Sequence, residues 1–298
     1  MPAFKERLDA LVTSGKWNIG YVHQTPESLI MNKGFVGNIN WLQEDKWDCT
    51  ADPFVYKRNG NFYIIYEEVK RFNDNGEIYV IENFDFSSKK KVQGLSPGNI
   101  HYSYPFLIED GNKLYCIPES SAAGEVCLYE VVSDDLTEFK KVKTLLHGKR
   151  FVDSSIIKYN GLFWLFTLCK EEPSNLLIYY ADKLDGDYTS HALSPVIVDA
   201  NTSRGAGNLF IAGGLLYRPT QNLSRAYGGS VMINRINHLT TDRYSSEILF
   251  EIQPHTPYNE GLHQISISDG TIVIDGYHNR VVIENIYRKL KRKIEGYI

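Results

Sequence analysis

The sequence predicts an all-β fold, a five-bladed β-propeller followed by a short C-terminal helix. A strand-like run, a glycine turn and an aromatic-rich strand recur in five units, which start near residues 51, 103, 153, 205 and 261. The turns are 51, 50, 53 and 56 residues apart, and their glycines are Gly60, Gly111, Gly161, Gly214 and Gly270. A repeat of about 50 residues built from short strands is typical of propellers. We therefore predict one propeller domain over residues 1–298.

Each unit begins with a β-hairpin. Its turn is Asn-Gly at positions 59–60 and 160–161, and Asp-Gly at positions 110–111 and 269–270. These dipeptides tolerate the positive φ that a two-residue hairpin needs. The second strands, such as 62–66 and 162–166, are β-branched and aromatic, and third strands follow from Glu77, Glu125 and Asn175. The period of two within the units excludes a helical repeat array.

Both ends of the chain have predicted roles. The last unit has few residues left for outer strands, so residues 16–23 are expected to return as a strand of that blade and close the ring. Residues 284–298 predict a short helix with five basic side chains between Arg288 and Lys293. It is interpreted either as a solvated basic helix or as a peripheral contact with an anionic membrane, at about 1 kcal/mol per basic residue.

Composition narrows the class of protein. With 43% hydrophobic and 13% aromatic residues, the chain can build a large core. A net charge of −4 argues against nucleic-acid binding, which usually needs a basic face. The charged N-terminus lacks the apolar region of a signal peptide, and no apolar run is long enough to span a membrane. Four cysteines without metal-type spacing predict reduced thiols and a cytoplasmic location.

A propeller brings the starts of its innermost strands together around one axis, where polar residues can form a site. In blade order these positions hold Asp52, then His101 with Tyr102 and Tyr104, then Asp153, Arg204, and Glu260 with His263. Convergent polar groups in one concavity are the usual form of a small-molecule site. For each residue alone a structural role is equally compatible with the sequence, such as a turn cap for either aspartate or a hydrogen-bonded core histidine.

A second ring follows from the ends of the second strands. It contains Glu67, Glu68, Glu119, Thr167, Gln221, Asp275 and His278. Glu119 follows an apolar strand, so it is interpreted as an acid with a raised pKa or as a salt-bridged carboxylate. Arg225 lies in a glycine-containing loop after Gln221, where it could bind an anionic ligand with its planar fork.

The blade-initial run ADPF, the hairpins and the fivefold repeat resemble the furanosidase-like propellers of glycoside hydrolase families 43 and 32. The resemblance implies that Asp52 matches the general base or nucleophile, and Asp153 the aspartate that orients the site. Family 43 places its general acid, a glutamate, at the start of blade four. The corresponding stretch here is TSRGAGN, with Arg204 and no carboxylate, which argues against simple hydrolysis.

A closer resemblance covers about residues 17–280. It is carried by the runs ADPF, HYSYPF, PES, VDSS, RGAGNLF, YRPTQNLSRAYGGSV and EGLHQIS. They are similar to the N-terminal propeller domain of the glucosamine inositolphosphorylceramide transferase family. In plant members, the assigned transferase domain is a separate C-terminal module. Related bacterial proteins carry the propeller alone or joined to a formyltransferase-like domain, often among surface-polysaccharide genes.

The sequence is compatible with three functions. The first is a glycosyltransferase-like enzyme of surface glycan or glycolipid assembly that takes an anionic activated sugar donor and a glycan acceptor. In it Asp52 is base or nucleophile, Asp153 orients it, and Arg204, Arg225 and His101 hold a phosphate leaving group. Tyr102, Tyr104 and Trp164 are candidates for stacking on sugar rings.

The second function is a glycoside hydrolase with Glu119 as a displaced acid, and the third is a non-catalytic glycan-binding module. We expect no cofactor and no catalytic metal, because no metal-binding motif or dinucleotide-binding glycine loop occurs. His263 is the residue best placed to contact a cation on the axis.

Overall fold

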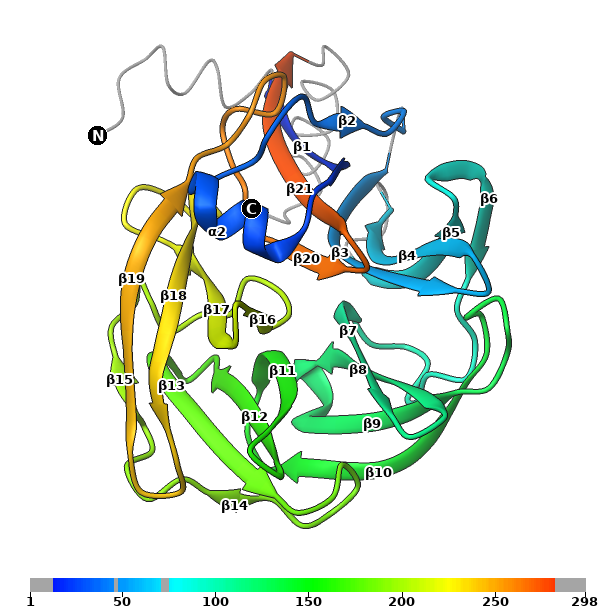
Figure 1. Cartoon of the computed structure of the whole chain (residues 1–298). Coiled ribbons are helices and arrows are strands. Elements are labelled where there is room, and N and C mark those ends of the chain that lie inside the picture. Colours follow the sequence, from blue (N-terminus) through cyan, green and yellow to red (C-terminus); the bar gives the residue numbers. More distant parts are fainter. Residues whose placement is uncertain (1–12, 46–47, 71–74, 282–298) are drawn as a thin grey trace, which may run out of the picture.

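The computed structural model describes residues 13–45, 48–70 and 75–281. Five antiparallel sheets are arranged in a ring, so the molecule is a five-bladed β-propeller, as the repeat predicts (Figure 1). Within the described ranges, no helix is long and apolar enough to cross a lipid bilayer. The predicted C-terminal helix and its basic residues lie outside the described residues, so membrane contact through them stays a prediction.

Blades 1 to 3 share one plan, in which strands follow each other outward from the axis. Blade 1 consists of β3 (Cys49–Arg58), β4 (Asn61–Val69), β5 (Gly76–Glu82) and β6 (Asp85–Lys91). Blade 2 consists of β7 (Ser103–Asp110), β8 (Lys113–Ser120), β9 (Glu125–Val131) and β10 (Phe139–His147), with the 3-10 turn η1 (Ser121–Ala123) after β8. Blade 3 consists of β11 (Phe151–Tyr159), β12 (Leu162–Cys169), β13 (Glu172–Ala181), β14 (Thr189–Ser190) and β15 (Ile197–Val198).

Blades 4 and 5 have much shorter innermost strands. Blade 4 consists of β16 (Phe210–Ala212), β17 (Leu215–Asn222), β18 (Ser230–Leu239) and β19 (Tyr244–Ile252). Blade 5 consists of β20 (Ile265–Ser268), β21 (Thr271–Val281), β1 (Thr13–His23) and β2 (Asn40–Trp41). The sequence predicts that these units start near 205 and 261, but there the chain forms loops with isolated bridges, among them Gly207–Ile265 between the two blades.

The N-terminal strand closes the ring. β1 pairs along its whole length with β21, from Thr13 opposite Val281 to His23 opposite Thr271. Blade 5 therefore combines the two ends of the described chain, and residues 16–23 occupy the place expected from the sequence. The short helix α2 (Pro26–Asn32) follows β1, and the Thr25 side chain caps its N-terminus by accepting from the Ser28 backbone N–H.

The core lies between neighbouring blades. One apolar cluster joins blades 5 and 1 and includes Ile19 and Ile64, while another joins blades 3 and 4 and includes Phe166 and Leu216. All four side chains are at most 1% exposed. Because each sheet buries both of its faces against the next, the strands read as apolar runs, and polar residues are left for the strand ends near the axis.

Candidate functional site

The innermost strands of blades 1 to 3 carry a β-bulge at equivalent positions. The register shifts between Ala51 and Phe54 in β3, and likewise in β7 and β11. The bulges contain Asp52, Tyr104 and Asp153, with φ of 51°, 44° and 48°. Left-handed backbone is uncommon for residues other than glycine and clusters at functional sites. The bulges turn two aspartates toward the axis, where their side chains are 11% and 4% exposed.

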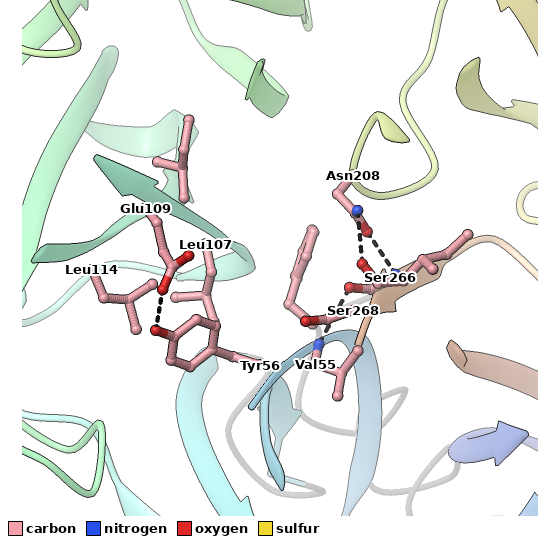
Figure 2. A pocket seen from close by; sticks show the side chains of 11 residues that line it. Val55, Tyr56, Leu107, Glu109, Leu114, Asn208, Ser266 and Ser268 are labelled. Atoms are coloured by element: carbon pink, nitrogen blue, oxygen red, sulfur yellow. Dashed lines mark hydrogen bonds between the residues drawn. The ribbon is translucent and has the colours of Figure 1, made fainter. Parts of the chain in front are cut away.

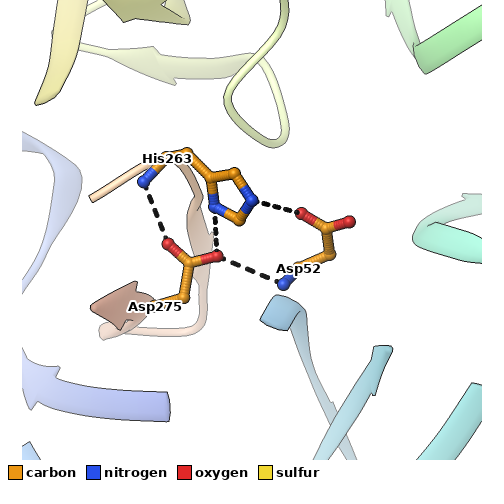
Figure 3. A group of neighbouring side chains, drawn as sticks. All are labelled: Asp52, His263 and Asp275. Carbon is orange, nitrogen blue, oxygen red and sulfur yellow. Dashed lines mark hydrogen bonds and ion pairs between the residues drawn. The ribbon is translucent and has the colours of Figure 1, made fainter. Parts of the chain in front are cut away.

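Asp52 lies in a group with His263 and Asp275 (Figure 3). His263 Nε2 is 3.6 Å from Asp52 Oδ1, and His263 Nδ1 is 2.5 Å from Asp275 Oδ2. The Tyr104 backbone N–H donates to Asp52 Oδ2 at 3.2 Å. Asp52 is thus held from blade 2 on one side and from blade 5 on the other.

The charges of this group depend on one another. Burial raises the pKa of Asp52 well above its ordinary value; His263 opposes this shift, and the nearby carboxylates Glu67, Asp153 and Asp275 add to it. Burial acts to lower the pKa of His263, but Asp275 and then Asp52 outweigh it and raise that pKa to about 9. A cationic His263 therefore favours the ionised form of Asp52, while the net shift of the Asp52 pKa remains upward.

Asp153 forms an ion pair with Arg204, which comes from the loop before β16. Arg204 Nε donates to Asp153 Oδ2 at 2.5 Å, and both side chains are largely buried. The guanidinium carbon is 5.0 Å from the centre of the Tyr227 ring, a cation–π contact. Burial would lower the pKa of Arg204, but Asp153 raises it above its ordinary value.

Glu119 lies at the end of β8, beside Asp153. The Asp153 backbone N–H donates to Glu119 Oε2 at 3.3 Å, and Lys170 Nζ is 3.5 Å from Glu119 Oε1. Burial and the charge of Asp153 raise the pKa of Glu119 to about 7, against the opposing effects of Lys170 and Arg204. Near neutral pH this carboxyl group can therefore donate a proton, as the sequence interpretation of Glu119 as an acid requires.

His101 lies at the edge of the site rather than on its floor. Its side chain is 39% exposed, and Nε2 is 2.9 Å from Glu67 Oε1. The Gly76 backbone N–H donates to Nδ1 at 2.8 Å, which leaves Nε2 to carry the proton toward Glu67. Glu67 in turn acts electrostatically on Asp52, so His101 is linked to the site through one carboxylate.

Three residues expected at the site lie away from this group. The Tyr102 hydroxyl donates to the Pro97 carbonyl oxygen, and its ring packs in the core of blade 2. Glu260 is exposed and accepts from Asn279 of β21. Arg225 is exposed and acts electrostatically on Glu251, at the outer side of blade 4. Tyr102, Glu260 and Arg225 do not occupy the bulge positions that turn Asp52 and Asp153 toward the axis.

Three further expected side chains are fully buried and support the site without facing a ligand. The Tyr104 hydroxyl accepts from the Gly207 backbone N–H at 2.8 Å, which ties blade 2 to blade 4. Gln221 Nε2 donates to the Gly205 carbonyl oxygen at 3.0 Å and fixes the loop that carries Arg204. Trp164 donates to the Tyr159 carbonyl oxygen and is 1% exposed, so it cannot stack on a sugar.

The site also includes residues that the sequence interpretation leaves out. Tyr227 is 57% exposed beside Arg204, and Trp17 of β1 stacks on His263 with ring centroids 4.1 Å apart. Gly228 has φ of 64°, and a Cβ there would lie 2.8 Å from Trp17. The glycine pair after Tyr227 is a usable signal for such close packing, whereas nothing local to Trp17 indicates that its ring stacks on His263.

Asp52, His263 and Asp275 also have donor atoms within 4.8 Å of one another, a spacing that could hold a metal ion. Both Asp275 oxygens, however, already accept from N–H groups: Oδ1 from His263 and Gln264, and Oδ2 from Asp52. The three side chains are therefore joined by hydrogen bonds and ion pairs, and a cation would have to share Asp275 Oδ2 with the Asp52 amide.

A separate pocket of about 180 Å³ lies further along β3, β7 and β20 (Figure 2). Tyr56 donates to Glu109 there, and the Val55 backbone N–H donates to Ser266 Oγ at 3.2 Å. Asn208 exchanges hydrogen bonds with the backbone of Ile267. Glu109 is the only charged side chain among its lining residues, so this pocket lacks the paired carboxyl groups of the site around Asp52.

Solved structures with the same fold include glycoside hydrolases. An exo-β-1,3-galactanase from Clostridium thermocellum matches with a TM-score of 0.54 and 15% identity, over 72% of this chain and 53% of that chain. A family 117 glycoside hydrolase from Zobellia galactanivorans matches with a TM-score of 0.54 and 13% identity, over 90% and 92% of the two chains. At this identity the likeness establishes the fold alone.

Relatives in sequence carry a different name. Glucosamine inositolphosphorylceramide transferase 1 of Oryza sativa subsp. japonica is 31% identical over 202 residues, 65% of this chain and 27% of the relative. Its namesake in Arabidopsis thaliana is 26% identical over 212 residues, 68% of this chain and 28% of the relative. The chain thus spans little more than a quarter of these relatives. The family model "Glucosamine inositolphosphorylceramide transferase 1, N-terminal" matches residues 44–260, and the chain belongs to that family.

Proposed function

We propose that this protein is a carbohydrate-active enzyme that transfers a glycosyl group during assembly of a glycolipid or surface glycan. The observation that carries the proposal is the pair of buried carboxyl groups with different surroundings, Asp52 beside a cationic imidazole and Glu119 beside a carboxylate. Burial raises the pKa of both groups, and their different charged neighbours provide two distinct carboxyl groups for acid–base catalysis. The relatives named as transferases support the choice of glycosyl transfer.

In this reaction Asp52 is the general base toward the acceptor hydroxyl. Burial makes its carboxylate more basic than an exposed aspartate, while His263 favours its ionised form. Asp153 is already paired with Arg204 and has its amide bonded to Glu119, so it orients the other two groups rather than reacting itself. This division agrees with the roles that the sequence resemblance implies for the two aspartates.

The donor is proposed to carry an anionic leaving group. Arg204 uses Nε for Asp153 and donates from Nη2 to the Tyr227 hydroxyl oxygen at 3.5 Å, so Nη1 is the group proposed to bind a phosphate oxygen. Lys170 is 46% exposed beside Glu119. Charge-assisted hydrogen bonds from these cations would stabilise the departing charge. Glu119 can protonate the same leaving group below about pH 7.

The four unpaired thiols favour a reducing compartment, and we propose that the reaction takes place in the cytoplasm.

A second candidate is glycoside hydrolysis, and one observation favours it. With a pKa raised to about 7, Glu119 has the property of the general acid that the start of blade 4 lacks. Water would then replace the acceptor hydroxyl at Asp52. This reaction needs no phosphate on the donor, which separates it experimentally from transfer.

The test is an assay of the purified protein with nucleotide sugars, lipid-phosphate sugars and aryl glycosides, with glycan and glycolipid acceptors, read by mass spectrometry. Glycosyl transfer that is lost in Asp52→Asn supports the proposal. Release of sugar from an uncharged aryl glycoside, lost in Glu119→Gln, would replace it by the hydrolase. Sugar binding that survives Asp52→Asn, without turnover of any substrate, would make the propeller a glycan-binding module.

A further inference from the structure

Asp275 lies next to Asp52 and His263. It is fully buried, at 0% exposure, on β21. It accepts from the backbone N–H groups of Asp52 at 3.2 Å, His263 at 3.0 Å and Gln264 at 3.0 Å. Both Asp275 oxygens therefore act as acceptors, and Oδ2 also forms an ion pair with His263 Nδ1 at 2.5 Å. One carboxylate therefore fixes the backbone of Asp52 and the ring of His263 together.

The imidazole of His263 is held in one orientation. Trp17 stacks on its face with an interplanar angle of 19°, and the Tyr227 ring meets it edge-on at 5.5 Å. Gly228 lies so close that a Cβ would come within 3.0 Å of His263 Cβ. With Nδ1 directed at Asp275, Nε2 can only face Asp52 (Figure 3).

We propose that Asp275 and His263 form a relay in which Asp275 orients a cationic His263, and His263 holds Asp52 in position as the ionised base. Asp275 and His263 are positioning residues, whereas Asp52 meets the substrate. The part of this inference that concerns Asp52 as a base rests on the proposed function. The orientation and charge of His263 do not, and they can be measured without a substrate.

The charges around Asp52 explain why a cationic His263 is needed to favour the ionised form of Asp52. His263 faces Asp275 on β21, Asp52 on β3 and Arg204 from the loop before β16, and β1 contributes the uncharged Trp17. Tyr227 also contacts its edge. Asp52 faces three other carboxylates, Glu67 on β4, Asp153 on β11 and Asp275. Without a charged imidazole, this concentration of acidic groups would favour a protonated Asp52, which cannot act as a base.

The relay lies at the seam where the ring closes. Asp275 is directly opposite Ile19 of β1, and Trp17 comes from the same strand. The partners of Asp52 in the relay thus come from the blade that joins the two ends of the described chain. Correct closure of the ring and the charge of the base are therefore coupled by the same few residues.

The experiment is an NMR pH titration of the imidazole signals of the full chain, with His263 assigned by the signals that His263→Gln removes. In the wild-type protein we expect His263 to lose its proton near pH 9 instead of 6.5. In Asp275→Asn we expect its midpoint to fall by about 1–3 pH units, because the strongest partner is neutralised. The matched control is Asp269→Asn on the same hairpin, where the carboxylate is exposed and pairs with Lys57, and the His263 midpoint should not move.

A wild-type midpoint near 6.5, or an equal midpoint in Asp275→Asn and wild type, would overturn the relay. Saturable shifts of the His263 signals on addition of stoichiometric Ca²⁺ or Zn²⁺ would also overturn it, because the group would then be a metal centre. If Asp275→Asn does not fold, Asp52→Asn decides: the midpoint should stay well above 6.5, since Asp275 remains, and a return to 6.5 contradicts the relay.

The titration also separates this inference from the proposed function. A raised midpoint that depends on Asp275, in a protein without any glycosyl transfer, would support the relay and refute the function. Where transfer is measurable, His263→Gln should move the acidic limb of the kcat/KM profile to higher pH, because Asp52 loses its cationic neighbour. An unchanged acidic limb would show that His263 does not tune Asp52.

Discussion

Blades 1 to 3 and blades 4 and 5 deliver side chains to the axis in two different ways. In blades 1 to 3 the innermost strands β3, β7 and β11 are eight to ten residues long and carry a left-handed bulge. In blades 4 and 5 the innermost strands β16 and β20 have three and four residues, and loops lead into them. Arg204 and His263 come from these loops.

The two kinds of blade contribute side chains of opposite charge to the site. Both aspartates lie on bulges of regular strands, while the cations that face them, Arg204 and His263, come from the irregular blades. A bulge re-aims a side chain without loosening the strand, so Asp52 and Asp153 are rigidly placed. The loops, in contrast, depend on close backbone packing and on the ion pairs themselves.

The largest effect is expected from Asp52→Asn, on the regular side. The amide cannot accept a proton, so turnover should fall by about 10²–10⁴-fold, the usual contribution of a general base. Steady-state glycosyl transfer would measure it, with Asp110→Asn, an exposed turn aspartate, as the control that should keep its activity. Wild-type turnover in Asp52→Asn would remove Asp52 from the mechanism.

The next prediction concerns the packing of the irregular blades. Gly207 has φ of 119°, and a Cβ there would lie 1.7 Å from the Ile265 carbonyl oxygen. Gly207→Ala should lower the free energy of unfolding by about 2–5 kcal/mol, from strain and overpacking together. Gly60→Ala is the matched control, since Gly60 has φ of 84° with open space around it, and it should cost only about 1 kcal/mol. Equal losses in urea unfolding would contradict the close packing of blades 4 and 5.

Arg204→Met tests the ion pair between the two kinds of blade. Removing the cation leaves Asp153 buried without its partner, and we expect a loss of about 2–3 kcal/mol, since Arg204 is partly exposed. Arg235→Met breaks an exposed pair with Glu247 and should cost less than about 1 kcal/mol. Urea unfolding of both variants gives the comparison, and similar small losses would show that Arg204 is not needed to hold Asp153.

The last prediction concerns the pH dependence that Glu119 imposes. Its pKa in the folded protein is raised to about 7 from 4.5, so the folded state binds the proton more tightly than the unfolded state. Stability should therefore fall as pH rises from about 4.5 to 7, and the activity that depends on the acid should be lost as pH rises through 7. Glu119→Gln should flatten both profiles, and unfolding curves at several pH values would show whether the wild-type slope has the opposite sign.

The fold and part of the site can be predicted from the sequence. The hairpin glycines at a constant interval predict the five blades, and Asp52, Asp153, Arg204 and His263 are brought together as expected. The positions that differ depend on long-range packing. Whether Tyr104 or its backbone faces the site is decided by a bulge, which shifts the two-residue period of the strand.

Asp275 and Trp17 make contacts that cannot be predicted from the sequence. The sequence places Asp275 at the end of its strand, whereas it lies in the middle of β21. Its three backbone N–H partners and its ion pair with His263 come from two blades and are not visible in any local pattern. Trp17 meets His263 because the N-terminal strand pairs with the last one. Such contacts between residues more than 200 positions apart follow from ring closure alone.

The most direct test of the central claim is a crystal structure of Asp52→Asn soaked with a nucleotide sugar that the assay identifies. We predict that the sugar lies between position 52, Asp153 and Glu119, with the phosphate against Arg204. Sugar bound only elsewhere, such as in the pocket lined by Tyr56 and Ser266, with an empty site at residue 52, would contradict it.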